Sequence, residues 1–167
     1  MALTPLSQAL SQILATIQSS PPTETVTLAD ATGRYAAKAV RSSVAVPPAD
    51  NSAMDGYAVR AQHVPGDLVV SQRIPAGRVP VSLAPGTAAR IFTGAEIPAG
   101  ADAVILQENA KPLLDGVRLP DAREGQHIRR RGSDIQAGDQ LVATGRYLQP
   151  QDIGLLASVG INEIEVY

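Results

Sequence analysis

Two carboxylates and a polar pair lie close together in the stretch Pro47–Val59. Asp50 and Asp55 are five residues apart, and Asn51 and Ser52 lie between them. A loop that combines fixed charge with hydrogen-bond donors and acceptors is typical of binding and catalytic sites. The alternative is a simple turn in which the aspartate and asparagine side chains accept backbone hydrogen bonds.

Asp55 is the first candidate for chemistry in this stretch. It is followed by Gly56, which a ligand can approach closely, so the carboxylate could bind a metal ion or serve as a general base. Its alternative role is that of a turn aspartate. Further along, Thr93 and Gly94 end an apolar run, and the glycine permits a turn with positive φ. A hydroxyl and backbone N–H groups at a strand end could hold an oxyanion or phosphate, unless Thr93 only ends its strand.

A run of three arginines, Arg129–Arg131, precedes Gly132, Ser133 and Asp134. In an extended chain the first and third arginines would share one face and Arg130 would lie on the other. Guanidinium groups bind phosphate and other tetrahedral oxyanions bidentately. Asp134 could orient an arginine or help to bind a metal ion. The alternative is a solvated arginine surface that Asp134 neutralises.

Helices are expected near both ends of the chain. Apolar residues at helical spacing predict a helix over 4–18, with Thr4 as its cap and Pro5 in its first turn. Asp30 is expected to cap a short helix running toward Lys38. A last helix begins at Pro150, and a strand follows it to the end of the chain.

Between these helices, short apolar runs alternate with turn signals, which favours strands. A hairpin turn is predicted at Asp115-Gly116. The predicted strands are Leu68–Ile74, Ala88–Thr93, Ala103–Glu108 and Val117–Leu119. The fold class is therefore mainly β with a few helices. We expect an irregular, elongated α+β domain of residues 1–47 and 135–167, interrupted by an inserted all-β domain, barrel- or sandwich-like, of residues 48–134.

Composition narrows the classes of function. The 167 residues carry a net charge of −2 and no block of like charge outside the arginine run, which argues against a nucleic-acid surface. There is no cysteine, which excludes thiolate chemistry, and His63 and His127 lack metal-ligand spacing. No apolar stretch approaches the ~20 residues that span a bilayer, and no secretion signal is recognisable. A cytoplasmic protein without a membrane partner is expected.

Four segments in order resemble the molybdopterin molybdenumtransferase family, to which the C-terminal region of gephyrin is related. They are Pro47–Val59, Ile91–Val104 with the following Gln107-Glu108, Ile128–Ile135, and Leu155–Gly160. The first is highly specific and the others are moderately so. His127 and Ser133 depart from the family pattern, since relatives often have Asn and Glu there. The last segment has the spacing of a packed helix and is assigned no chemistry.

The resemblance implies the front half of an enzyme that inserts molybdate into adenylylated molybdopterin, with Mg²⁺ required. The implied catalytic residues are Asp55, Thr93, Arg129 and Asp134, with Asp55 or Asp134 as a possible metal ligand. Asn51, Ser52, Gly94 and Arg130 are the expected substrate-binding residues. The resemblance further implies a homodimer, in which this region faces the pterin-holding domain of the other subunit. That domain and a small β domain are expected to follow after residue 167.

Two alternatives belong to other classes of function. A dimerisation or scaffold module derived from the same family would use the face Leu6–Ile17 and leave the polar loops without chemistry. A free-standing phosphate- or nucleotide-binding domain is disfavoured, because no glycine-rich phosphate-binding loop occurs.

Overall fold

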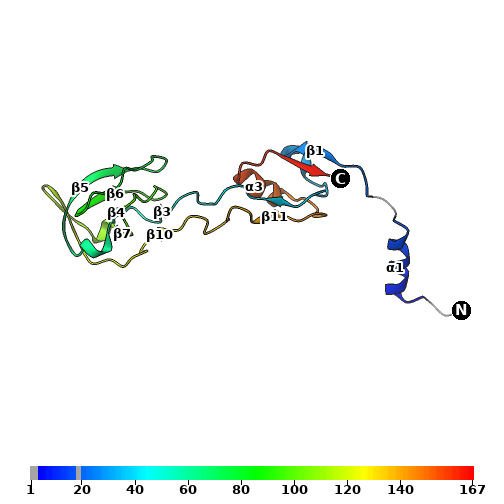
Figure 1. Ribbon diagram of the computed structural model, residues 1–167, viewed down its shortest axis with the longest axis horizontal. Coiled ribbons are helices and arrows are strands. Elements are labelled where there is room, and N and C mark those ends of the chain that lie inside the picture. The colour runs from blue at the N-terminus through cyan, green and yellow to red at the C-terminus, as the bar shows by residue number, and fades with distance from the viewer. Residues whose placement is uncertain (1–3, 18–19) are drawn as a thin grey trace. The chain divides into compact units, whose positions relative to one another are not determined.

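The structure is a computed structural model that describes residues 4–17 and 20–167 (Figure 1). The chain divides into two compact units. Unit 1 comprises Met1–Arg41 and Gln140–Tyr167, and unit 2 comprises Ser42–Asp139. Unit 2 is therefore an insertion within unit 1. It begins six residues before and ends five residues after the predicted range 48–134.

The wider limits of unit 2 follow from backbone pairing between its two ends. The Ser42 N–H donates to the Asp139 carbonyl at 2.9 Å, and the Val46 N–H donates to the Ile135 carbonyl at 2.8 Å. The two end segments therefore run as an antiparallel ribbon. The prolines at positions 47 and 48, used to place the predicted boundary, lie inside this unit.

Unit 1 is built on two antiparallel strand pairs and short helices. Strand β1 (Glu24–Thr27) pairs with β12 (Glu163–Val166), and β2 (Val40–Arg41) pairs with β11 (Gln140–Val142). Helix α2 (Leu28–Ala31) and helix α3 (Pro150–Ser158) complete it. The buried core of this unit consists of Leu28, Ala31, Ala36, Val142, Leu148, Leu156, Ile164 and Val166.

The prediction of a helix capped by Asp30 was wrong. Helix α2 starts earlier, with Thr27 in the N-cap position and Asp30 inside its single turn. The Thr27 hydroxyl donates to the Asp30 carboxylate at 2.8 Å, so the two side chains satisfy each other at the helix start. Beyond the helix the chain runs through Gly33, whose φ of +84° ends it.

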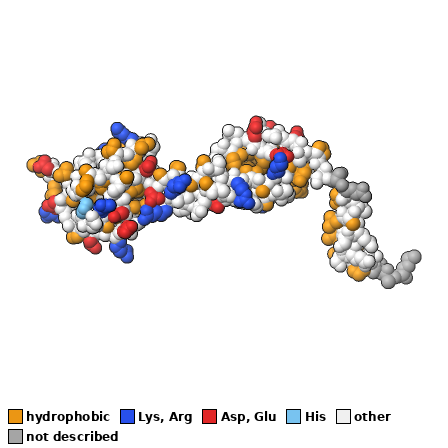
Figure 2. Space-filling view, in the orientation of Figure 1, with side chains coloured by type: hydrophobic (Ala, Val, Ile, Leu, Met, Phe, Trp, Pro, Cys, Tyr) orange, Lys and Arg blue, Asp and Glu red, His pale blue; other side chains and the backbone are white. Residues whose placement is uncertain are grey.

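Helix α1 (Leu6–Ala15) follows Pro5, which occupies the N-cap position. No side chain caps it, so the predicted capping by Thr4 was wrong, and residue 18 lies outside the described residues. None of its residues is buried, and its apolar side chains lie along one side in Figure 2. Among the described residues, no helix is long and apolar enough to cross a membrane.

Helix α3 begins with a capping box that includes a buried carboxylate. Asp152 accepts hydrogen bonds from the Gln149 N–H at 3.0 Å and from the Arg146 guanidinium at 2.9 Å. Its side chain is only 8% exposed. The hydrogen bond from Arg146, followed by the one from Gln149, holds the pKa of Asp152 below its ordinary value of 3.8 in spite of burial.

Asp152→Asn is expected to destabilise the protein by about 2 kcal/mol at pH 7, because a charged hydrogen-bond acceptor is lost at a buried cap. A carboxylate with a lowered pKa in the folded protein contributes stability above its unfolded pKa, and that contribution is lost as the pH falls through the folded pKa. The difference in unfolding free energy between wild type and variant should therefore shrink below about pH 4. Urea unfolding at pH 7 and pH 3 measures it, and a difference independent of pH would contradict the assigned role.

Unit 2 is organised around a six-stranded sheet in the order β7-β4-β6-β5-β9-β8, in which β5 and β6 are parallel and the other neighbours are antiparallel. The strands are β4 (Gly56–Val59), β5 (Gly66–Ile74), β6 (Thr87–Ile91), β7 (Ala103–Leu106), β8 (Lys111–Leu113) and β9 (Gly116–Leu119). Strands β3 (Asn51–Ser52) and β10 (Ile128–Arg129) form a separate antiparallel pair. Two short 3-10 turns, η1 (Ala61–His63) and η2 (Gln107–Asn109), follow β4 and β7.

Successive strand residues enter two different buried clusters of unit 2. Ala58 and Ala89 belong to one cluster with Ile91, while their neighbours Val59 and Ala88 belong to the other. Both faces of the sheet are therefore covered, as alternating side chains require. With three α-helices in the described residues, the protein is mainly β as predicted. The barrel or sandwich form of the insert stays a prediction.

The hairpin between β8 and β9 turns one residue earlier than predicted. Leu113 pairs with Gly116, so the turn residues are Leu114 and Asp115. Gly116 belongs to strand β9. A side chain is not tolerated there, since a Cβ would lie 2.3 Å from the Leu68 carbonyl oxygen of neighbouring β5. Close approach of two backbones, rather than the turn, requires this glycine.

Candidate functional site around Asp55

The Asp55 carboxylate is held by Thr93 at the end of β6. One carboxylate oxygen, Oδ1, accepts the Thr93 backbone N–H at 2.8 Å and the Thr93 hydroxyl at 2.9 Å. These two hydrogen bonds, in that order, and then the charge of Arg90 lower the pKa of Asp55 below its ordinary value of 3.8. The carboxylate is ionised at neutral pH, and among the described residues no donor occupies its Oδ2.

Arg90 fixes the backbone on both sides of this carboxylate. Its guanidinium donates to the carbonyls of Gly56 and Ile91, each at 2.8 Å, and to the side chain of Gln107. The Gln107 N–H in turn donates to the Asp55 carbonyl at 3.1 Å. Arg90 thereby ties β4, β6 and η2 together around Asp55. Its guanidinium also stacks on an aromatic ring, with its central carbon 4.4 Å from the Phe92 centroid.

A second cluster forms around Asp50, at the start of the same loop. One Asp50 oxygen accepts the Arg130 guanidinium at 2.6 Å and the other accepts the Arg131 N–H at 2.7 Å. The backbone hydrogen bond from Arg131 is the main cause of a lowered Asp50 pKa, and the Arg130 side chain adds to it. Arg130, a predicted substrate-binding residue, is thus paired with Asp50 while half of its side chain stays exposed.

Arg129 and Asp134 form an ion pair, and the Ser133 hydroxyl donates to the same carboxylate at 3.1 Å. Both oxygens of Asp134 are therefore engaged. The three neighbouring arginines have different partners, since Arg131 donates from its side chain to the Pro48 carbonyl at 3.1 Å. Arg130 and Arg131 thus contact the loop Pro47–Val59, whereas Arg129 pairs with Asp134, and all three arginines remain exposed.

Strand β3 joins the two clusters. Asn51 pairs with Arg129 of β10, and the Ser52 carbonyl accepts the Gly94 N–H at 2.9 Å. The end of the Asn51 amide group faces the carbonyls of Ala49 and Asp50, and with its nitrogen assigned to that side it donates to both. Ser52 is buried, and its hydroxyl donates to the Met54 carbonyl at 2.6 Å. In this arrangement both side chains hold the loop in shape.

Gly94 occupies the turn that follows Thr93, with a φ of +81° that favours glycine. The Gly94 N–H donates to the Ser52 carbonyl of β3. This predicted substrate-binding residue therefore has no free N–H for a ligand. His127 also has a positive φ, of 54°, in the left-handed region that asparagine tolerates well. Its carbonyl accepts the Ala53 N–H at 2.9 Å, which connects His127 to the loop Pro47–Val59.

The described residues contain no group of three or more His, Cys, Asp or Glu side chains placed to hold a metal ion. Mg²⁺ is often bound through one or two carboxylates, with waters and substrate phosphates as its other ligands. Asp55 has a carboxylate oxygen that fits this mode, whereas both oxygens of Asp134 are in use. Of the two candidate ligands, Asp55 is therefore the one with capacity for an ion.

Arg90 and Gln107 were not among the candidate residues, although Gln107 lies in a matched segment and Arg90 directly precedes the segment Ile91–Val104. Their role depends on strand register, because Tyr57 of β4 lies opposite Arg90 of β6 and Ile105 of β7. The available signal was a lone arginine in an otherwise apolar strand, Thr87–Ile91. A charged side chain in a half-buried strand is unfavourable unless it is hydrogen-bonded. The Arg90 guanidinium has three acceptors, which are two backbone carbonyls and the Gln107 side chain.

Comparison with known proteins agrees with this arrangement. The family described as MoeA N-terminal region (domain I and II) matches residues 4–160. Molybdopterin molybdenumtransferase 2 of Mycobacterium tuberculosis is 40% identical over 151 residues, which cover 85% of this chain and 37% of that protein. Molybdopterin molybdenumtransferase of Haemophilus influenzae is 38% identical over 169 residues, with 97% and 41% covered.

A solved structure extends the match to the fold. The molybdopterin biosynthesis MoeA protein of Pyrococcus horikoshii superposes with a TM-score of 0.89 at 35% sequence identity, over 99% of this chain and 44% of that one. The chain thus spans less than half the length of the relatives it matches. With a family match over residues 4–160, the predicted resemblance is confirmed, and the chain belongs to the MoeA N-terminal family.

Proposed function

We propose that this chain is part of a molybdopterin molybdenumtransferase, which inserts molybdenum from molybdate into adenylylated molybdopterin. The observation that carries the proposal is the Asp55 carboxylate, ionised and oriented by Thr93, with one oxygen left for a ligand. Relatives that match most of this chain are named for that transfer.

In this proposal the Asp55 oxygen binds Mg²⁺ or takes a proton from the water that cleaves the adenylate. The Mg²⁺ would offset negative charge on the phosphate and molybdate oxygens that it contacts. Arg129, held by Asp134, and Arg130, held by Asp50, present guanidinium donors for those oxygens. Thr93 keeps the carboxylate in place, and Asn51, Ser52 and Gly94 shape the loop through which the substrate is contacted.

We further propose that the chain supplies half of a composite site. The pterin is held by domains of the longer relatives that lie outside the matched region, contributed by the other subunit of a homodimer. This division agrees with a chain that spans less than half the length of the relatives it matches.

Turnover of adenylylated molybdopterin with molybdate and Mg²⁺ tests the proposal. The chain alone is compared with a protein in which it precedes the remaining domains of a matched relative. Activity only in the longer protein supports the half-site. Activity of the chain alone would mean that it holds the pterin itself, and inactivity of both would favour the alternative below.

The alternative is a dimerisation or scaffold module, and one observation favours it. The apolar residues of helix α1 are 53–85% exposed at Leu6, Leu10, Ile13 and Leu14 (Figure 2). An uncovered amphipathic helix is typical of a surface that binds another protein or another part of its own. Sedimentation of Leu10→Ser/Leu14→Ser beside the Asp55→Asn variant separates the readings, since only the helix variant should change association if the scaffold is the function.

A further inference from the structure

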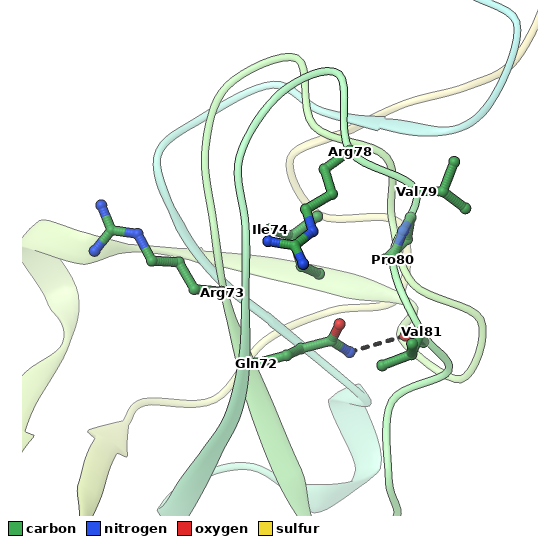
Figure 3. A pocket seen from close by; sticks show the side chains of 7 residues that line it. All are labelled: Gln72, Arg73, Ile74, Arg78, Val79, Pro80 and Val81. Atoms are coloured by element: carbon green, nitrogen blue, oxygen red, sulfur yellow. Dashed lines mark hydrogen bonds between the residues drawn. The ribbon is translucent and has the colours of Figure 1, made fainter.

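The loop between β5 and β6 encloses a cavity of about 390 Å³ on unit 2 (Figure 3). One arm of the loop is the end of β5 and the other is the extended segment 79–81. The Gln72 side-chain amide donates to the Val81 carbonyl at 2.8 Å and bridges the two arms. This volume is at the lower end of the range for cavities that hold small organic ligands.

Arg78 enters this cavity from the tip of the loop. Figure 3 shows its side chain between the two arms with the guanidinium beside Ile74, whereas Arg73 points away on the other side of β5. No described residue accepts a hydrogen bond from the Arg78 guanidinium or forms an ion pair with it. Five N–H donors are therefore directed into a cavity of the protein with no protein acceptor.

The charges that line the cavity are of one sign. Its ionisable residues are Arg78, which is directed into it, and Arg73, whose guanidinium lies over the Phe92 ring at 4.6 Å from the centroid. The remainder of the lining is Gln72 and apolar side chains such as Ile74 and Pro80. Arg78 is exposed, as are the neighbouring Val79 (81%) and Val81 (69%), so its guanidinium is accessible to a ligand from solvent and can bind an oxyanion bidentately. The cavity therefore favours an anionic ligand.

The same arginine borders the site around Asp55. A second cavity of about 240 Å³ shares Arg78 with the first and is also lined by Asn51 and Gly94. The loop tip lies against the turn after Thr93, since a Cβ on Gly94 would be 3.9 Å from the Ala76 methyl group. Glu96 lines only the smaller cavity, which places the preferred position of an anion in the larger one.

We propose that Arg78 binds the phosphate group of an organic phosphate ester in this cavity, beside the catalytic loop. The inference rests on the proposed function, in which a phosphate-bearing substrate reaches Asp55. The guanidinium would bind two phosphate oxygens, and the apolar walls would contact the organic part. The side-chain amide nitrogen of Gln72 already donates to the Val81 carbonyl. The Oε1 oxygen of the same amide group is available to accept a hydrogen bond from the organic part of the ligand.

Titration of the 167-residue chain with adenosine monophosphate, followed by ¹⁵N NMR, tests this site. Arg78→Gln should weaken binding by about 10–100-fold, the value of one charge-assisted bidentate contact. Arg78→Lys, which keeps the charge and loses the fork, should fall between. Arg73→Gln is the matched control, because it removes the other positive charge of the lining, whose guanidinium lies over the Phe92 ring rather than in the cavity, and it should bind like the wild type. Unchanged urea midpoints establish that all variants are folded.

Several results would overturn the assignment. They are equal losses in the Arg73 and Arg78 variants, shifts confined to residues away from segment 72–81, and binding of inorganic phosphate as tight as that of the nucleotide. Molybdenum insertion by the longer protein is measured in parallel. If the longer protein inserts molybdenum but nucleotide binding does not depend on Arg78, the site is rejected and the proposed function stands. If nucleotide binding depends on Arg78 but the longer protein inserts no molybdenum, the proposed function is rejected and the site stands.

Discussion

Gly56→Ala is expected to unfold unit 2 or to destabilise it by about 3–5 kcal/mol, a large part of the stability of a typical domain. A Cβ at this position would lie 1.9 Å from the Ile105 carbonyl oxygen and 2.8 Å from its carbonyl carbon. Both atoms belong to the backbone of β7, which pairs with β4 at this point, so a side-chain rotation cannot relieve the contact. Strand β4 would have to separate from β7.

Urea unfolding with far-UV circular dichroism measures this effect. Gly154→Ala is the matched control, since that glycine lies exposed within α3 and a Cβ there meets nothing within 4 Å. The control should gain about 0.5–1 kcal/mol, because alanine is the better helix former. A Gly56→Ala protein with a wild-type midpoint would mean that β4 and β7 are not in contact as described.

The consequence reaches the site, because Gly56 follows Asp55 directly. The Gly56 carbonyl accepts Arg90 at 2.8 Å, and the Asp55 carbonyl accepts Gln107 at 3.1 Å. A displaced β4 would move the carboxylate away from Thr93. In any Gly56→Ala protein that still folds, the Thr93 amide proton should therefore move upfield, because it has lost its hydrogen bond to the Asp55 carboxylate.

Asp55→Asn is expected to lower molybdenum insertion by about 10²–10⁴-fold in the longer protein, the range for loss of a general base. An asparagine keeps an oxygen that can accept from the Thr93 N–H at 2.8 Å, so the loop should retain its shape. It removes the negative charge that a metal ion or a proton requires. The loss should therefore appear in kcat with little change in the urea midpoint.

Asp67→Asn is the matched control for this variant. Asp67 is also an exposed carboxylate of unit 2, and its pKa is lowered by the side chain of Arg118, 2.6 Å away. It lies at the start of β5, among none of the candidate residues. Equal activity of the Asp55→Asn variant and the control would exclude Asp55 from the chemistry.

Local signals were sufficient for much of this protein. Among the residues singled out in segments that match a family, Asp55 is hydrogen-bonded to Thr93, Asp50 to Arg130 and Asp134 to Arg129. The pairing of Arg129 with Asp134, five residues apart, is a contact that a short loop nearly imposes. Apolar periodicity likewise predicted α3 and the strands of unit 2.

Contacts between distant residues were decided only by the tertiary structure. Arg130 reaches Asp50 across 80 positions, and Arg90 reaches Gly56 across 34. Both depend on which strands are neighbours and in what register, and a change of one residue in register would turn either side chain to the opposite face. The parallel pairing of β5 with β6 is likewise a contact between distant residues. The loop that connects these two strands carries Arg78.

The sequence by itself therefore determined the family, the candidate carboxylates and arginines, and the mainly β class, because motifs and periodicity are carried by neighbouring residues. The tertiary structure decided which carboxylate oxygen is left for a ligand, which arginine donates to the Gly56 carbonyl next to Asp55, and why Gly56 and Gly116 admit no side chain. These properties depend on distances between strands that only packing of the whole unit establishes.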